Sequence, residues 1–326
     1  MKIDFLGDVY LDKQYDIEID LNQYIFNLEY PLSTSGIPAN NKVNLGVDVS
    51  YFKETFGSLP LAVNLSNNHI MDYGEESYSD TIKYLEKNNI LYFGAGNRTN
   101  NFNNPCIIKQ EDRIVSLLGY CCPSTHPIFG STSKNGAAPL DLILIKKDIE
   151  EQKKKSDFII VNLHWGDEEI SYPKPSDIEK ARQIIDMGAD LIIGHHAHVI
   201  QSKETYNGKK IFYGIGNFLF PNLNTPAKHN GKEFTKIYKK VQNNKNRKSI
   251  IITLDNNQNI TYRTTYFDDK KVILKNTIIL NWLPKTETGY KIYLKIWSKI
   301  RMLELYIKNP RIPTFKQIKI FLGLKT

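Results

Sequence analysis

The sequence of 326 residues has few cysteines, no long apolar run and no leader-like start. Its three cysteines, Cys106, Cys121 and Cys122, form no CxxC pair, which excludes a disulfide framework and a thiolate zinc site. We expect them to be buried small hydrophobic residues in a reducing compartment rather than catalytic thiols. No run approaches the roughly 18 apolar residues of a membrane-spanning helix. Met1 leads into Ile3–Leu6 without the basic and apolar regions of a signal peptide, so we expect a cytoplasmic protein.

The formal charge of +8 is unevenly distributed along the chain. Residues 227–326 contain 22 Lys and Arg but 6 Asp and Glu, whereas residues 1–226 contain 21 basic and 29 acidic residues. The chain therefore has an acidic body and a basic C-terminal third. This distribution excludes a uniformly basic face for nucleic acid along the whole chain.

Residues 1–220 alternate short β-rich runs with helical stretches, which predicts a layered α/β domain. Several runs are continuously apolar, as is typical of strands that are covered on both faces. The predicted strands are Ile3–Leu6, Leu61–Leu65, Ile90–Phe93, Ile114–Leu118, Phe158–Leu163, Leu191–Ile193 and Ile211–Tyr213. Helical spacing predicts helices over Glu75–Lys87 and Ser176–Met187, the second with Ser176 as its N-cap.

Composition changes after residue 220. The stretch Pro221–Lys248 is rich in Asn, Lys and Gly, which predicts a long mobile loop. Two further runs, Ile250–Leu254 and Ile260–Tyr266, predict a β-hairpin. We therefore expect one domain over residues 1–284, including that loop and hairpin, and a basic helical tail over residues 285–326.

Histidines, carboxylates and asparagines follow the predicted strands or, for Glu29, the run Phe26-Asn27-Leu28, and most of them lie close to a glycine. The residues concerned are Asp8, Glu29, Asn67, Asn68, His69, Asp72, His164, His195, His196 and His198. In open α/β sheets the carboxyl ends of the strands form the ligand crevice, so we expect these side chains to converge there. Imidazole and carboxylate ligands suit Zn, Mn or Fe. A polar loop with unrelated histidines is the alternative.

Two of these histidines stand two residues apart. In an irregular loop His196 and His198 can both point into one site, and on a regular strand they would also share a face. The spacing thus permits both to serve one metal centre in either conformation.

These segments resemble the bacterial CapA family, which is associated with poly-γ-glutamate and other capsule synthesis and has a calcineurin-like metallophosphoesterase fold. The resemblance runs from Lys2 to about Phe220. It rests on Gly7-Asp8, Asn27-Leu28-Glu29, Asn67-Asn68-His69, Asp72-Tyr73-Gly74, Phe93-Gly94-Ala95-Gly96, His164-Trp165-Gly166 with Glu168, Gly188-Ala189-Asp190, His195–His198 and Tyr213–Phe218. It implies a layered α/β/β/α sandwich, here followed by the basic helical tail.

The resemblance also implies two divalent metal ions, of manganese, iron or zinc, about 3.5–4 Å apart and bridged by a carboxylate and a water or hydroxide. The first metal would be held by Asp8, His198 and Glu29, with Glu29 as the bridge. The second would be completed by Asn68, His164 and His196.

The remaining residues of the motifs would support the chemistry. His69 would stabilise or protonate the leaving oxygen, and Asp72 would orient its imidazole. Residues that line the crevice, bind substrate or support the metal ligands would be Asn67, His195, Trp165, Glu168 and Asn217. The chain departs from the family pattern where Tyr10 replaces a histidine, Ala197 a proline and Glu169 an aromatic residue.

The implied function is that of a metal-dependent hydrolase, a phosphoesterase, in the biosynthesis of a capsule or another surface polymer. Its partner would be a phosphorylated or polymeric precursor. The alternative is a non-hydrolytic accessory or scaffold protein of a membrane capsule-synthesis complex, because family membership does not establish the reaction. Hydrolysis or transfer at an amide or glutamyl bond is a third possibility.

The tail contains an amphipathic pattern over Tyr290–Asn309. Apolar side chains recur at helical intervals, and lysines are spaced by four at Lys291, Lys295 and Lys299. The apolar positions are Tyr293, Ile296, Trp297, Ile300, Leu303 and Ile307. Such a helix either lies on the anionic inner face of a membrane or docks on the domain with a solvated lysine face. Binding of single-stranded nucleic acid is a third, less favoured hypothesis, because the chain contains no recognisable nucleic-acid module.

Overall fold

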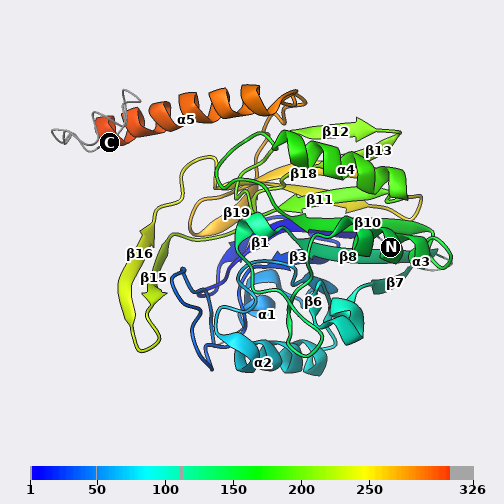
Figure 1. Cartoon of the computed structure of the whole chain (residues 1–326), viewed down its shortest axis with the longest axis horizontal. Coiled ribbons are helices and arrows are strands. Elements are labelled where there is room, and N and C mark those ends of the chain that lie inside the picture. The colour runs from blue at the N-terminus through cyan, green and yellow to red at the C-terminus, as the bar shows by residue number, and fades with distance from the viewer. Residues whose placement is uncertain (1, 49, 111–112, 309–326) are drawn as a thin grey trace.

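The computed structural model describes residues 2–48, 50–110 and 113–308 and consists of two sheets with helices outside them (Figure 1). The first sheet has nine strands, which include the N-terminal strand. They are β1 (Ile3–Val9), β2 (Asp16–Ile17), β3 (Gln23–Leu28), β4 (Ala62–Asn64), β5 (Leu91–Phe93), β14 (Asn217–Leu219), β17 (Lys248–Leu254), β18 (Ile260–Phe267) and β19 (Lys271–Leu274). Their order is β2-β19-β18-β17-β1-β3-β4-β5, with β14 also paired to β1.

The second sheet has six strands. They are β7 (Cys106–Gln110), β8 (Arg113–Cys121), β10 (Phe158–His164), β11 (Leu191–His195), β12 (Lys203–Tyr206) and β13 (Lys209–Phe212). Their order is β12-β13-β11-β10-β8-β7. Two short antiparallel pairs lie outside both sheets, and they join β6 (Ala95–Gly96) to β9 (Gly136–Ala137) and β15 (Leu223–His229) to β16 (Phe234–Lys240).

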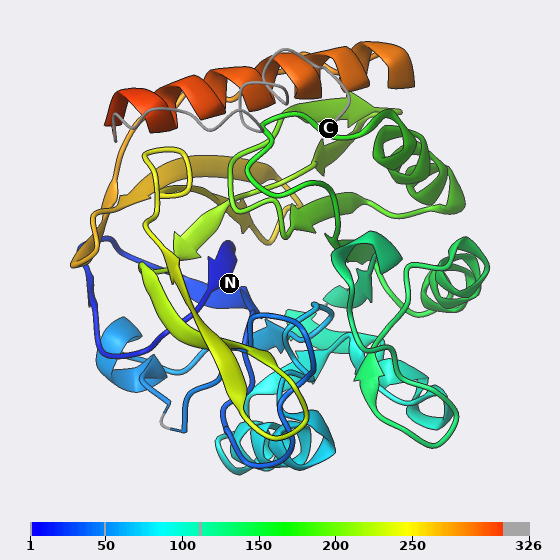
Figure 2. The same ribbon diagram turned by 60° about the vertical axis from the view of Figure 1, so that its left-hand side comes forward.

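Helices cover the outer face of each sheet. The first sheet packs against α1 (Phe52–Phe56) and α2 (Gly74–Lys87), and the second against α3 (Leu142–Gln152) and α4 (Pro175–Met187). Short 3-10 helices lie at Arg98–Asn103 and Pro123–Thr125. The last helix, α5 (Glu287–Lys308), runs along the margin of the molecule (Figures 1 and 2).

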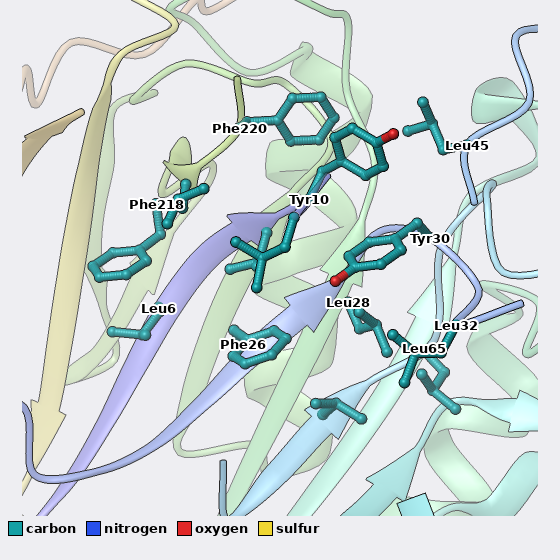
Figure 3. Close-up of a cluster of buried hydrophobic side chains, with 14 of the residues drawn as sticks. Leu6, Tyr10, Phe26, Leu28, Tyr30, Leu32, Leu45, Leu65, Phe218 and Phe220 are labelled. Carbon is teal, nitrogen blue, oxygen red and sulfur yellow. The ribbon is translucent and has the colours of Figure 1, made fainter. Parts of the chain in front are cut away.

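Side-chain alternation along the strands produces three hydrophobic cores and so four layers. On β10, Ile160 packs between the sheets, whereas Ile159 and Val161 pack toward α3 and α4. On β1, Phe5 faces the second sheet and Leu6 joins the core under α1 and α2, part of which Figure 3 shows. The predicted α/β/β/α sandwich is confirmed.

The strands predicted within residues 1–220 are all present, as β1, β4, β5, β8, β10, β11 and β13. The predicted helices correspond to α2 and α4, and the predicted hairpin to the antiparallel pair β17–β18. The N-cap prediction was wrong: α4 begins at Pro175 and its N-cap is Lys174, not Ser176. Proline at the first helical position fixes φ near its helical value, so the helix starts two residues earlier than an N-cap at Ser176 would place it.

The prediction of a long loop over Pro221–Lys248 was also wrong, because this segment contains the hairpin β15–β16. Buried Leu223, Ala227 and His229 alternate on β15 with side chains that are more exposed. Burial therefore alternates along β15 with the two-residue period of a strand, but the buried positions include small and polar residues instead of aliphatic ones alone. The edge of β15 continues onto the segment before α1 through a bridge between Val43 and Ala227.

The tail begins as a helix, as predicted, and its division from the body at residue 284 stays a prediction. The predicted break at Pro310 and Pro313 lies outside the described residues. Across residues 2–48, 50–110 and 113–308, no helix combines the length and apolarity needed to cross a membrane.

Candidate metal centre

The predicted site residues come together where the carboxyl ends of both sheets meet. Parallel pairing aligns β1 with β3 and β14, so Asp8 lies beside Asn27 and Asn217. Parallel pairing of β10 with β11 likewise places His164 beside His195. Glu29 follows β3 directly. Residues from distant parts of the chain therefore share one crevice, as the strand-end pattern predicts.

Close backbone approaches explain the glycines beside these residues. A Cβ atom on Gly7 would lie 1.9 Å from the carbonyl oxygen of Gly216, and one on Gly194 would lie 1.8 Å from that of Tyr213. Only glycine permits these contacts, which bring β1 against β14 and β11 against the segment before β14. The glycines thus hold Asp8 and the histidine loop at their observed separation.

A first ligand cluster is formed by Asp8, Glu29 and His198, each of which offers one ligand atom within 4.8 Å of the others. The Nε2 atom of His198 lies 3.7 Å from Glu29 Oε1. Its Nδ1 atom lies 2.8 Å from the amide oxygen of Asn217, which can only accept, so Nδ1 carries the proton. Asn217 therefore leaves the Nε2 lone pair directed toward Glu29.

A second cluster shares Glu29 and adds His164 and His196. The Nε2 atom of His164 lies 3.6 Å from Glu29 Oε1 and 2.8 Å from Asn68 Oδ1. The imidazole centroids of His164 and His196 are 4.7 Å apart. The four residues that would hold the second metal are thus together, with Glu29 between the two clusters.

The histidine loop after β11 is irregular, which is one of the two conformations that the sequence left open. His196 and His198 have φ angles of 81° and 55°. This left-handed backbone is uncommon for residues other than glycine and is characteristic of constrained functional loops. It lets both rings enter the same crevice.

Burial determines the electrostatics of the clusters. Burial, together with the negative charge of Asp8, raises the pKa of Glu29 well above its usual value. Burial also lowers the pKa of His164 well below its usual value and lowers the pKa of His196 to about 3. The imidazoles are therefore neutral and offer lone pairs, while the buried carboxylates favour a cation.

Unsatisfied polar atoms show that the donor set fits divalent metal ions. Within the part of the chain that the structure describes, Glu29 Oε1 and Oε2 and His196 Nδ1 are buried without a hydrogen-bond partner. Such atoms are costly to bury unless they bind a ligand. Carboxylate and imidazole donors are those that Zn, Mn and Fe take in proteins. Asp8, His198, Glu29, Asn68, His164 and His196 would hold them.

The predicted catalytic pair lies beside these ligands. His69 Nδ1 donates to Asp72 Oδ2 over 2.6 Å, and its Nε2 takes no part in this hydrogen bond. Asp72 is fully buried, and it also accepts from the backbone N–H of Leu45 at 2.7 Å. The Lys42 ammonium forms an ion pair with Asp72 and donates to the carbonyl oxygen of Asn68.

Two lysines at the site were missed by the sequence analysis. Lys42 belongs to no motif, and its segment is held by the bridge from β15. Lys240, on β16, lies 3.2 Å from Glu169 and 3.7 Å from Glu168. The pKa of Glu168 is lowered to about 2. Burial alone would raise this pKa, but the positive charges of His198 and Lys240 have the larger combined effect. The hairpin β15–β16 positions both lysines, and the composition of this segment did not predict that hairpin.

The other predicted supporting residues have defined contacts. The side chain of Asn67 accepts from the backbone N–H groups of His69 and Ile70 and donates to the carbonyl of Leu28, which fixes the loop that carries His69. His195 lies between Asp8 Oδ1, at 3.2 Å, and Asn162 Oδ1, at 3.3 Å. It therefore positions Asp8.

Two aromatic residues pack behind the crevice. Trp165 is buried in the core under α3 and α4, where its indole N–H donates to the carbonyl of Tyr213 over 2.8 Å. Tyr10, at the position where the family pattern has a histidine, packs edge-on against Tyr30, with ring centroids 5.1 Å apart. Tyr10 also contacts Phe220, whose ring contacts His198 (Figure 3 shows Tyr10, Tyr30 and Phe220).

Comparison with known proteins finds matches across this region. The family model described as bacterial capsule synthesis protein PGA_cap matches residues 6–222. The capsule biosynthesis protein CapA of Bacillus anthracis is 32% identical over 202 residues, which cover 60% of this chain and 49% of that protein. The PGA biosynthesis protein CapA of Bacillus subtilis is 35% identical over 159 residues, which cover 48% of this chain and 42% of that protein. The chain thus spans about half the length of these relatives.

Among solved structures, a 5′-nucleotidase from Candida albicans matches with a TM-score of 0.44 and 9% sequence identity. The match covers 76% of this chain and 43% of that chain.

Proposed function

Because the chain belongs to the bacterial capsule synthesis protein PGA_cap family, we propose that it is a dinuclear metal-dependent hydrolase that acts in the biosynthesis of a capsule, poly-γ-glutamate or another surface polymer. The proposed substrate is a phosphate ester of a polymer precursor. The observation that carries this proposal is the pair of ligand clusters that share Glu29. Two sets of donors that share one carboxylate can hold two metal ions side by side, which is the arrangement that two-metal hydrolysis uses.

The residues divide the chemical work. Metal ions, when bound, polarise the ester and lower the pKa of water. Asp8, Glu29, Asn68, His164, His196 and His198 would hold the metal ions. His69 would donate its Nε2 proton to the departing oxygen from the protonated ring, whose Nδ1–H is held by Asp72. Burial lowers the pKa of His69, and the negative charge of Asp72 opposes that effect by favouring the protonated ring.

The proposed location is the cytoplasm. The structure supports it with three free and buried thiols, Cys106, Cys121 and Cys122, which persist in a reducing compartment. Burial raises the pKa of the Cys106 thiol to about 12, so that thiol is no nucleophile near neutral pH.

A hydrolysis assay tests the proposal. The purified chain is stripped of metal, reloaded with Mn, Fe or Zn in turn, and assayed against p-nitrophenyl phosphate, its bis ester and a γ-glutamyl p-nitroanilide. We expect metal-dependent cleavage of a phosphate ester, and we expect His69→Ala to lower kcat by about 10²–10⁴-fold with unchanged metal content.

The matched control is His126→Asn, at an exposed residue with φ of 58° that asparagine tolerates. Cleavage of the anilide alone would replace the phosphoesterase with a hydrolase of glutamyl bonds. Metal binding without any turnover would favour the accessory or scaffold role, and unchanged kcat in His69→Ala would refute the assigned acid.

A further inference from the structure

The helix α5 contacts the body through one aromatic side. Tyr290 is buried, and its hydroxyl donates to Asp167 Oδ2 over 3.0 Å. The ring of Tyr293 contacts that of Tyr172, with centroids 5.0 Å apart. These contacts lie in the first two turns of α5. They attach the helix to the loop after β10, which carries Glu168.

A different side of α5 exposes a row of aliphatic residues. Ile292, Ile296, Ile300 and Leu303 are separated by four, four and three residues, so they share a face. Each of their side chains is between 52% and 54% exposed. Figures 1 and 2 both place α5 at the margin of the molecule, outside the two sheets. We call these four residues the apolar row.

Each isoleucine of the apolar row is preceded by an exposed lysine. The pairs are Lys291-Ile292, Lys295-Ile296 and Lys299-Ile300. Successive residues lie about 100° apart around a helix, so the lysines form a second row beside the apolar row. Residues 285–326 contain ten basic and two acidic residues, so the charge of this region is strongly positive.

The exposed indole of Trp282 lies five residues before the start of α5 at Glu287. Trp282 is 54% exposed, and its ring contacts Tyr172 edge-on with centroids 4.7 Å apart. Tyr172 thus lies between Trp282 and Tyr293. Tryptophan is enriched at the boundary between water and the membrane interior, where one end of the ring is apolar and the other is hydrated.

We propose that α5 lies on the surface of an anionic lipid bilayer. The apolar row enters the boundary between headgroups and acyl chains, and the lysine row contacts anionic headgroups. Charge complementarity favours this partner over a second copy of the chain, because an interface between two apolar rows would bring lysine rows of like charge together. The proposal does not depend on the metal chemistry of the crevice.

Vesicle flotation with the full chain tests the proposal. We expect binding to vesicles of phosphatidylcholine with phosphatidylglycerol, little binding to phosphatidylcholine alone, and release at high salt. The double variant Ile296→Ser with Ile300→Ser should weaken binding roughly tenfold or more. Lys291→Gln with Lys295→Gln should weaken it about thirtyfold. The matched control is Ile143→Ser on α3, whose side chain is 83% exposed, and it should bind like the original protein.

Other outcomes would overturn the proposal. Equal binding to both vesicle types, or equal binding by the isoleucine variant, would exclude an anionic bilayer as the partner of the apolar row. A dimer in sedimentation that Ile296→Ser with Ile300→Ser dissociates, without vesicle binding, would assign the row to a second copy. Thermal unfolding and metal content of each variant report folding independently.

Discussion

The metal centre and helix α5 differ in how their charged residues are held. In the crevice Asp8 is fully buried and contacts Asn27, His195 and His198 as well as the backbone of His196. On α5 the lysine and apolar rows are exposed, and Tyr290 and Tyr293 in its first two turns contact the body. A buried network transmits a substitution to all its members, whereas an exposed helix face does not. The hydrolysis proposed for the crevice therefore depends on exact placement, and the membrane contact proposed for α5 depends on summed area and charge.

The largest expected effect follows from removing the shared carboxylate. Glu29→Gln keeps the side-chain shape but removes the charge that both clusters use. We expect turnover to fall by about 10³-fold or more, with loss of bound metal, while vesicle binding through α5 stays unchanged. Elemental analysis and the ester assay measure the first two, with His126→Asn as the control. Full metal content in Glu29→Gln would show that Glu29 is not shared.

A smaller effect is expected from a residue that only orients a ligand. Asn217→Ala removes the acceptor that holds His198 Nδ1, so the imidazole rotates more freely. We expect metal affinity to fall by about 10–100-fold, as competition with a chelating indicator would measure. Asn224→Ala, on the exposed side of β15, is the control. Equal affinity in the two variants would mean that crevice packing alone orients His198.

The same contrast explains what could be predicted from the sequence. The ligands follow parallel strands, whose apolar runs and adjoining glycines are local signals, so convergence of Asp8, Glu29 and His164 was predictable. Lys42 and Lys240 reach the site through the hairpin β15–β16, and its pairing depends on contacts distant in sequence. Long-range pairing has no local signature when small and polar side chains carry the alternation.

For α5 the periodicity predicted the apolar positions but not their partners. The sequence groups Tyr293 with Ile296 and Ile300 in one amphipathic pattern. The structure divides them, because Tyr293 contacts Tyr172 whereas the isoleucines are more than half exposed. A helix with a wide apolar face can pack on the domain with one part of that face and expose the other part. Periodicity does not distinguish the two parts, and only tertiary contacts show which part is packed.

A third prediction concerns stability where α5 rests on α4. Asp177, at the start of α4, is buried, and burial raises its pKa to about 6. A carboxyl whose pKa is higher in the folded state than in the unfolded state costs stability as the pH rises from about 4 through 6. The full cost at pH 7 is about 3 kcal/mol. Asparagine does not reproduce every contact of the protonated carboxyl, so the substitution recovers only part of this cost.

We therefore expect Asp177→Asn to stabilise the protein by about 2 kcal/mol at pH 7 and by much less at pH 4.5. Urea unfolding at the two pH values measures the difference. Glu179→Gln, at an exposed position of the same helix, is the matched control measured at both pH values. A stabilisation that is equal at both pH values would show that Asp177 is ionised throughout this range.

The smallest expected effect tests whether the two regions are independent. Tyr290→Phe removes the hydroxyl that binds Asp167 but keeps the buried ring, and Lys174 still pairs with Asp167 at 2.7 Å. We expect a loss of about 1 kcal/mol in the local stability of α5, seen as faster amide hydrogen exchange over residues 287–303. Tyr293→Phe, which keeps the ring contact with Tyr172, is the matched control.

Metal affinity and turnover should stay within about twofold of the original values in Tyr290→Phe, since neither Tyr290 nor Asp167 is a proposed ligand and substitutions at sites without shared partners act independently. Asp167 nevertheless precedes Glu168, which faces Lys240 at the crevice. A change in metal affinity with intact helix contacts would therefore show that this loop couples α5 to the metal centre. In that case α5 would not be independent of the buried network, because Asp167 would connect the two. Binding of α5 to a bilayer would then also change the metal affinity of the crevice.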